Sequence, residues 1–235
     1  MSSQGAFRFE ECCPSLPAPD GHCHGLDFAF IYIDDILVAS KDVETHKEHL
    51  RLLFQRLQEY GLVINVSKSQ FGCDTIDFLG HHITHAGIMP LPDQVDAITQ
   101  FNQPSTVKGL QEFVGMVNFY HRFIPAAARM MLPLFEALTN KPKTLVWNEA
   151  MVKAFQDTKK ALAEATLLTH PHHDAPTSLT ADASEQAVGA VLQQSVNGVW
   201  VPLAFLSKKL RPPERKYSAF DRELLALYLG IRHFR

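Results

Sequence analysis

The stretch Phe28-Ala-Phe-Ile-Tyr-Ile-Asp-Asp-Ile-Leu-Val-Ala39 decides the fold, because two adjacent carboxylates, Asp34 and Asp35, interrupt its apolar run. Such a run predicts buried strands, and the acidic pair predicts a turn between them. Neighbouring side chains of a strand point to opposite faces, so both carboxylates can face one ligand only where the chain turns. One interpretation is a tight hairpin that turns at least Asp34 toward a divalent ion, and the alternative is a solvated Asp-Asp turn.

The same stretch resembles a known enzyme signature. Tyr32-Ile-Asp-Asp35 matches the Tyr-x-Asp-Asp signature of reverse transcriptases, and Phe30–Ser40 is similar to the gypsy-type retroelement enzymes over its whole length. The resemblance implies an RNA-directed DNA polymerase in which Asp34 and Asp35 bind Mg²⁺, with Mn²⁺ as the alternative ion, and Tyr32 contacts nucleic acid. The partners it implies are an RNA/DNA template-primer hybrid and deoxynucleotides.

Composition sets bounds on the class of protein. With 235 residues, 46% of them hydrophobic, the chain can form one or two domains with a core. The net charge of -3 gives no global basic field for nucleic acid, although a basic groove can be local. The four cysteines have no framework spacing, and no stretch is typical of a signal peptide or membrane span. We therefore expect an intracellular protein of the cytoplasm or nucleus, with no membrane partner.

The first 25 residues differ from the rest of the chain. They contain three prolines and no hydrophobic periodicity, which predicts an unstructured leader, and they do not resemble the family. Their possible metal ligands are Cys12, Cys13, His22, Cys23 and His24. Because this spacing fits no usual zinc pattern, we interpret it as coincidence.

Beyond the acidic hairpin, apolar residues at helical spacing over residues 43–57 predict an amphipathic helix lying on the sheet. Phe78-Leu-Gly-His81 then resembles the family's segment at the primer terminus, which implies nucleic-acid contacts by Gly80 and His81. Glycine allows a close backbone approach, and a plain bulge is the alternative explanation of Gly80. For the histidines of this region, a solvated hairpin is favoured over a three-histidine metal site. These are His81, His82 and His85.

A helical region is predicted next. Pro90 and Pro92 precede one helix, and Leu110–Ile124 keeps a helical period and resembles the thumb of the gypsy-type enzymes. Two such helices beside the palm would hold the template-primer duplex through basic side chains that suit phosphate contacts. These are Lys108, Arg122 and Arg129, for which an ordinary solvated helix surface is the alternative.

A second acidic centre is predicted after a linker at residues 169–176. Alternating segments at hairpin intervals predict a three-stranded antiparallel meander that contains Asp182, followed by a helix. The apolar stripe of that helix, expected to face the sheet, comprises Tyr217, Phe220, Leu224, Leu227, Tyr228 and Ile231. Asp221 and Glu223 lie on opposite edges of the stripe, so periodicity alone leaves open which of them faces Asp182.

The family resemblance removes this ambiguity. Residues 180–184, 188–193 and 217–226 are similar to the retroelement ribonuclease H domain, which implies that Asp182 and Glu223 are its first two metal-binding carboxylates. Such a site uses two Mg²⁺ ions roughly 4 Å apart to activate a water and stabilise the leaving oxygen. Polymerisation uses the same device, and either reaction needs at least three converging carboxylates.

The resemblance implies an α/β chain in four segments. Residues 1–25 form the leader, 26–90 the C-terminal half of a palm, 91–168 a helical thumb and connection, and 169–235 an incomplete ribonuclease H-like α/β domain. Each acidic centre therefore has only part of the family's carboxylate set. We expect the isolated chain to lack both polymerase and ribonuclease H activity. The alternatives are a non-catalytic remnant that binds nucleic acid or protein, and a decayed reading frame without a selected role.

Overall fold

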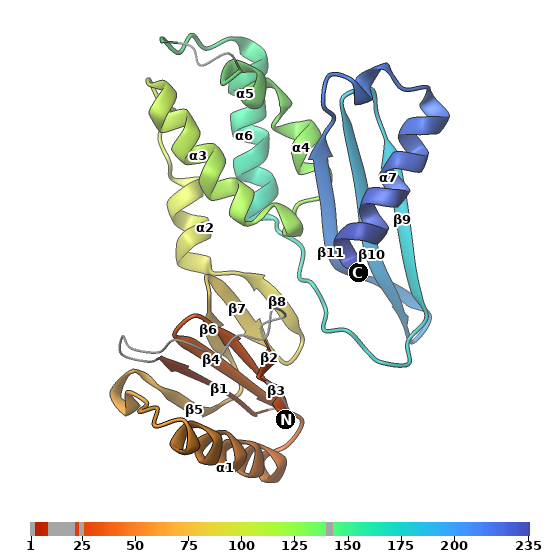
Figure 1. Ribbon diagram of the computed structural model, residues 1–235. Coiled ribbons are helices and arrows are strands. Elements are labelled where there is room, and N and C mark those ends of the chain that lie inside the picture. Colours follow the sequence, from red (N-terminus) through yellow and green to blue (C-terminus); the bar gives the residue numbers. More distant parts are fainter. Residues whose placement is uncertain (1–2, 9–21, 24–25, 140–142) are drawn as a thin grey trace. The chain divides into compact units, whose positions relative to one another are not determined.

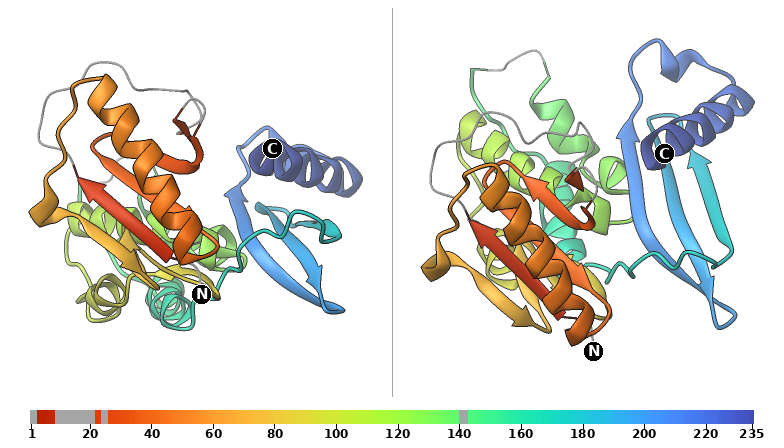
Figure 2. Two further views of the ribbon diagram at one scale, coloured as in Figure 1. Left: turned by 90° about the horizontal axis from the view of Figure 1, so that it is seen from below. Right: turned by 60° about the horizontal axis from the view of Figure 1, so that its bottom comes forward.

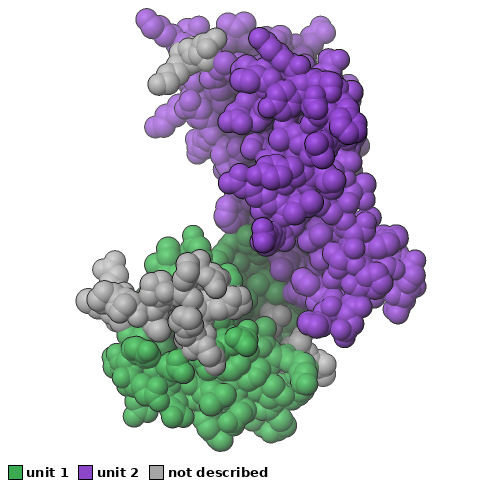
Figure 3. All heavy atoms as spheres, turned by 45° about the vertical axis from the view of Figure 1, so that its right-hand side comes forward, with its two compact units in different colours: residues 1–86 green, residues 87–235 purple. Residues whose placement is uncertain are grey.

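The computed structural model describes residues 3–8, 22–23, 26–139 and 143–235. The chain divides into two compact units, residues 1–86 and 87–235 (Figures 1 and 3). Both contain helices and antiparallel sheets, which confirms the predicted α/β class. No helix within the described ranges is both long and apolar enough to cross a bilayer.

The first unit is built on a five-stranded sheet with the order β2-β3-β4-β1-β5. Its strands are β1 (Ser3–Arg8), β2 (His22–Cys23), β3 (Leu26–Tyr32), β4 (Asp35–Ser40) and β5 (Gln70–Cys73). The β3–β4 hairpin pairs Ala29 with Val38 and Ile31 with Ile36. Ala29, Ile36 and Val38 are fully buried, so the apolar stretch that decides the fold forms the centre of this unit's core.

Helix α1 (Val43–Glu59) covers one face of this sheet (Figure 2). It begins at Asp42, whose side chain accepts a hydrogen bond from the Thr45 amide at 2.8 Å. Leu53 and Leu57 project from the helix into the cluster formed by the sheet. A short 3₁₀ turn, η1 (Val66–Lys68), follows, and β6 (Ile76–Phe78) then pairs with β7 (His81–Thr84) in a hairpin.

The structure corrects the expectation of an unstructured leader for part of residues 1–25. Strand β1 pairs with β4 over its whole length, from Ser3 opposite Ser40 to Arg8 opposite Asp35, and with β5 on its other side. An interior strand satisfies the backbone groups of both neighbours and needs no hydrophobic periodicity to do so, which is why the sequence pattern missed it. The expectation is also wrong for β2. Cys12, Cys13 and His24 lie outside the described residues.

The second unit begins with β8 (Gly87–Pro90) and a set of helices. The helices are α2 (Pro92–Thr99), α3 (Val107–Phe119), η2 (His121–Phe123), α4 (Ala127–Met130), α5 (Leu132–Ala137) and α6 (Glu149–Ala163). Thr106 caps α3 by accepting from the Gly109 amide at 3.1 Å. Phe113, Phe123 and Phe155 are the largest fully buried side chains of the core among these helices.

A three-stranded sheet follows in the second unit, with the order β11-β10-β9. Strands β9 (Thr177–Ala183), β10 (Ala187–Val196) and β11 (Val199–Lys209) are antiparallel neighbours, which confirms the predicted meander. Asn197 and Gly198 form the β10–β11 turn with φ of 53° and 79°, and Asn-Gly is a preferred pair for such a two-residue hairpin. The 3₁₀ turn η3 (Glu214–Lys216) leads to helix α7 (Ala219–Phe234), which packs on β9 and β10 (Figure 1).

The orientation of α7 differs from the expectation. The apolar stripe predicted to face the sheet is solvent-exposed, and the side that contacts the sheet carries Ala226 and Gly230 with Leu225 and Leu229 beside them. A Cβ at Gly230 would lie 3.2 Å from the Ala190 Cβ, so the helix approaches β10 closely at this point. Small residues permit this approach and bulky ones do not, which is why the larger stripe is turned outward.

Candidate functional site

The acidic pair lies at the bend between β3 and β4, as predicted. Tyr32 pairs with Asp35, so that Ile33 and Asp34 form a two-residue turn. Ile33 has a φ of 54°, in the left-handed region, where a β-branched residue costs about 1–3 kcal/mol. Tyr32 and Asp34 are exposed, and Asp35 is half-buried. The surrounding sheet therefore holds a strained turn that presents carboxylates to solvent.

A buried polar cluster lies at the other end of β4. Ser40 Oγ is 3.1 Å from His46 Nδ1 and 2.8 Å from His49 Nδ1, and the ring of Phe28 stacks on His49 with centroids 3.7 Å apart. Burial, followed by the charge of His49, lowers the pKa of His46 from its usual value. The cluster joins α1 to the strand that carries Asp35. Sequence analysis assigned it no role, although a histidine at an apolar position of the helical pattern was a signal.

This cluster predicts an acid-sensitive first unit. The pKa of His46 is lowered in the folded state, so the unfolded chain binds the proton more readily. Stability is therefore fully present above about pH 6.5 and falls as the pH drops from there through the folded-state pKa. Hydrogen exchange of α1, corrected for its intrinsic pH dependence, should show this loss of protection. It should be smaller in H46L and unchanged in H85Q, a substitution at an exposed histidine of the same unit; equal acid sensitivity in H46L and the parent chain would refute the assignment.

The residues predicted to contact the primer terminus form the β6–β7 turn. Leu79 and Gly80 have φ of 47° and 75°, so the turn itself accounts for the glycine. His81 Nδ1 is 2.8 Å from the Leu79 carbonyl oxygen, and His82 Nδ1 is 2.7 Å from Asp77 Oδ1. No group of three metal-ligand side chains is found in residues 3–8, 22–23, 26–139 and 143–235, so the hairpin histidines form no metal site there.

The three basic residues predicted on the thumb are all exposed, but they do not form one cluster. Lys108 lies in the first turn of α3, whereas Arg122 belongs to η2, beyond the opposite end of that helix. A helix of 13 residues is about 20 Å long, which separates the two charges. Arg129 lies on α4. The residues therefore offer separate contact points along the surface.

The second acidic centre is formed by β9 and α7. Glu223 Oε1 accepts a hydrogen bond from the amide of Ala183 at 3.3 Å, directly after Asp182 on β9. Asp221 has a different role, because its carboxylate accepts from the hydroxyl of the helix cap Ser218 at 2.7 Å. Glu223 therefore faces the strand that carries Asp182, which periodicity left open. Both Asp182 and Glu223 are exposed.

Two family models match the chain. Residues 18–83 match the model described as reverse transcriptase (RNA-dependent DNA polymerase), and residues 147–235 match the RNase H-like domain found in reverse transcriptase. The chain is 33% identical over 216 residues to the retrovirus-related Pol polyprotein from transposon opus of Drosophila melanogaster, and 33% identical over 205 residues to the Tf2-3 polyprotein of Schizosaccharomyces pombe. The chain belongs to the reverse transcriptase and ribonuclease H family of retroelement Pol polyproteins.

This Pol segment covers only a small part of its relatives. The alignments include 88% and 87% of the chain but 22% of the opus polyprotein and 15% of the Tf2-3 polyprotein. In solved structures it resembles foamy viral protease-reverse transcriptase with double-stranded DNA (TM-score 0.77, 23% identity, 89% of this chain and 37% of that chain). A complex of that protein with an RNA/DNA hybrid has a TM-score of 0.75 at 24% identity, covering 87% of this chain and 28% of that chain. At this identity the likeness shows the fold alone.

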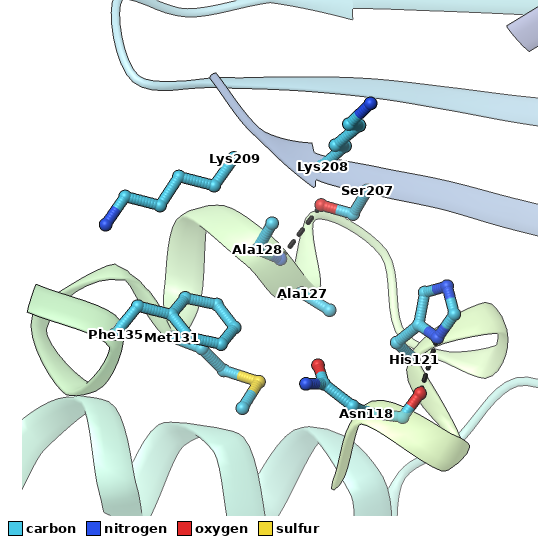
Figure 4. A pocket seen from close by; sticks show the side chains of 9 residues that line it. All are labelled: Asn118, His121, Ala127, Ala128, Met131, Phe135, Ser207, Lys208 and Lys209. Carbon is cyan, nitrogen blue, oxygen red and sulfur yellow. Dashed lines mark hydrogen bonds between the residues drawn. The ribbon is translucent and has the colours of Figure 1, made fainter. Parts of the chain in front are cut away.

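A basic pocket of this Pol segment was not predicted from the sequence. It has a volume of about 340 Å³ and is lined by Asn118, His121, Ala127, Ala128, Met131, Phe135, Ser207, Lys208 and Lys209 (Figure 4). The Ala128 amide donates to Ser207 Oγ at 2.9 Å, which connects α4 to β11 at this pocket. None of the lining residues is acidic. The basic residues Lys208, Lys209 and Arg211 near the end of a predicted strand were the available signal.

Further positive charge lies next to this pocket. Burial and the neighbouring charges of His121 and Arg122 lower the pKa of His233 on α7. Arg122 is exposed, and its guanidinium carbon lies 5.8 Å from the centroid of the Phe123 ring. Arg122, which the sequence predicted as a phosphate contact, therefore belongs to a basic region that includes residues of the ribonuclease H-like segment.

Proposed function

We propose that this chain is the part of a retroelement polymerase that supplies carboxylates to two-metal phosphoryl-transfer sites and basic side chains to a nucleic-acid substrate. The observation that supports it best is the strained Tyr32–Asp35 hairpin, which presents two carboxylates where a chain of ordinary stability would favour glycine at Ile33. Backbone strain of this kind is concentrated at functional sites.

Carboxylate oxygens are the ligands that Mg²⁺ prefers, and both acidic centres consist of them. Asp34 and Asp35 would hold the ion at the first centre, and Asp182 and Glu223 at the second. A bound Mg²⁺ or Mn²⁺ would stabilise the charge that develops on the transferring phosphoryl group. The residues themselves contribute position: the turn brings Asp34 and Asp35 to one bend, and the hydrogen bond to Ala183 keeps Glu223 against β9.

We propose an RNA/DNA template-primer hybrid and deoxynucleotides as the substrates of the complete enzyme. The foamy viral structures of the same fold are complexes with double-stranded DNA and with an RNA/DNA hybrid. In this chain, Tyr32, Gly80, His81, Lys108, Arg122 and Arg129 remain the proposed nucleic-acid contacts. We add Lys208 and Lys209, because they border a pocket with no acidic residue in its lining.

The isolated chain is proposed to be catalytically inactive. Each acidic centre brings together two carboxylates, and no group of three metal-ligand residues exists within the described parts of the chain. Two-metal catalysis needs more ligands than either pair supplies. A second candidate function, binding of nucleic acid without catalysis, is favoured by the basic region around Lys208, Lys209 and Arg122, since phosphate contacts do not require a complete metal site.

Binding and catalysis are tested together on the purified chain. With a labelled RNA/DNA hybrid at low salt, we expect measurable binding by fluorescence anisotropy, about tenfold weaker binding by K208Q/K209Q, and a salt dependence reduced by about one per lost lysine contact. K153Q/K160Q, which removes two exposed lysines of α6, serves as the matched control. Primer extension and hybrid cleavage should both stay at background with Mg²⁺ or Mn²⁺.

The outcomes separate the parts of the proposal. Mg²⁺-dependent extension that is lost in D34N would contradict the inactivity of the isolated chain while supporting the assignment of Asp34. Equal affinities of K208Q/K209Q and K153Q/K160Q would remove Lys208 and Lys209 from the proposed contacts. Absence of binding at every salt concentration would exclude the non-catalytic binding function.

A further inference from the structure

The outer face of α7 is an apolar surface that the described parts of the chain leave uncovered. Phe220 is 75% exposed, Leu224 57%, Leu227 40% and Ile231 55%. Tyr228, beside them, is also exposed. Scattered apolar residues on a surface are ordinary, but a contiguous set on one helix marks an interaction site. We call Phe220, Leu224, Leu227 and Ile231 the α7 seam.

The spacing of the α7 seam is that of a helix–helix contact. Its members follow one another at intervals of four, three and four residues, which is the a/d repeat by which two helices interlock. The opposite side of α7 is already used, because Ala226 and Gly230 are buried against the sheet of the same chain. The helix is therefore apolar on two sides, and only one side has a partner.

We propose that the α7 seam binds the same seam of a second copy of this chain, with the two helices antiparallel about a two-fold axis. In this register Leu224 packs against Leu227 of the second copy, and Phe220 packs against Ile231 of the second copy. Each layer then contains one a-type and one d-type residue, and the two-fold axis repeats both layers. A seam with this symmetry is complementary to itself, as an isologous interface requires.

The charges at the ends of α7 favour the antiparallel arrangement. Its first turns carry Asp221 and Glu223, and its last turn carries Arg232, with Arg235 directly beyond. Antiparallel helices place the acidic end of one copy beside the basic end of the other, and their dipoles oppose. Parallel helices would bring like charges together at both ends. The charge pattern therefore selects a second copy in the opposite direction.

The strength of this contact follows from its size. Four layers on one helix form an interface smaller than the standard of about 1,600 Å² of total buried surface. We expect a dissociation constant of roughly 10 µM, so that the full chain changes from monomer to dimer over about two orders of magnitude in concentration. Sedimentation velocity over this range, at low and high salt, measures the transition.

Substitutions on the seam test its register. L224E and L227K should each raise the dissociation constant by more than about tenfold, because each buries a charge against an apolar partner. The double variant L224E/L227K places opposite charges across both copies of the central layer and should regain part of the affinity. The control is V146E, which adds a charge at an exposed valine of the same unit. Circular dichroism confirms that each variant is folded, as expected for substitutions at exposed positions.

Each outcome decides the proposal. Dimerisation that both single variants reduce, that the double variant restores and that V146E leaves unchanged supports the antiparallel seam. A chain that remains monomeric at all concentrations overturns it and assigns the face to another occupant. Dimerisation that L224E does not change places the interface elsewhere, and failure of the double variant to recover overturns the antiparallel register. None of these results depends on nucleic-acid binding or catalysis.

Discussion

Replacement of Phe113 by alanine is expected to lower the free energy of unfolding of the second unit by about 3–5 kcal/mol. Phe113 is fully buried in the helical core, where its ring centroid lies 4.4 Å from that of Phe155. Truncation removes the buried apolar surface of the ring and leaves a cavity that a close-packed core cannot fill. Urea unfolding followed by the fluorescence of Trp147, whose ring centroid is 5.6 Å from that of Phe155, measures the loss.

The same helix supplies the control for this experiment. Phe119, at the last position of α3, is 52% exposed, so F119A should change the free energy of unfolding by less than about 1 kcal/mol. A similar loss in F113A and F119A would show that helix propensity, rather than core packing, governs the effect. It would contradict the placement of Phe113 at the centre of the core.

Gly230 is expected to be almost as sensitive, although it has no side chain. Its ideal Cβ position lies 3.2 Å from both the Ala190 Cβ and the Leu179 Cδ2, so G230L would force α7 away from β10. We expect a net loss of about 2–3 kcal/mol, since overpacking outweighs the roughly 1 kcal/mol that helix propensity returns when glycine is replaced. Hydrogen exchange of α7 should show the loss of protection directly.

Gly115 is the matched control, because it is also a helical glycine but has no atom within 4 Å of its ideal Cβ position. G115L should therefore leave the second unit equally stable or raise its free energy of unfolding by about 0.5–1 kcal/mol. Displacement of α7 in G230L should also separate Glu223 from the Ala183 amide, which ties this packing contact to the second acidic centre. Unchanged α7 protection in G230L would disprove the close approach.

The packing of α7 has a consequence for both proposals. The small residues that let the helix approach the sheet hold Glu223 at β9, and they also turn the α7 seam outward. One local contact thus positions a candidate metal ligand and exposes a candidate interface. The proposals remain independent, because Leu224 and Leu227 can be changed without touching Glu223, and oligomeric state is measured without substrate.

The acidic hairpin was predictable because all of its determinants are neighbours in the sequence. The apolar run on each side of Asp34 and Asp35 predicts two strands, and a two-residue connection brings those strands together. The backbone strain at Ile33 was not predictable, because nothing local favours a positive φ for isoleucine. Pairing along the whole hairpin imposes that conformation.

By itself, the sequence determined the α/β class, the bend that presents Asp34 and Asp35, and the meander that leads to Asp182, since each follows from short-range periodicity and turn chemistry. Only the tertiary structure decided that Ser3–Arg8 joins the first sheet, that Lys208 and Lys209 border a pocket with His121, and that α7 turns its bulky residues away from β10. These features depend on which backbone edges and which small residues meet across long sequence separations. Periodicity identifies the faces of a helix, but packing selects the face that is buried.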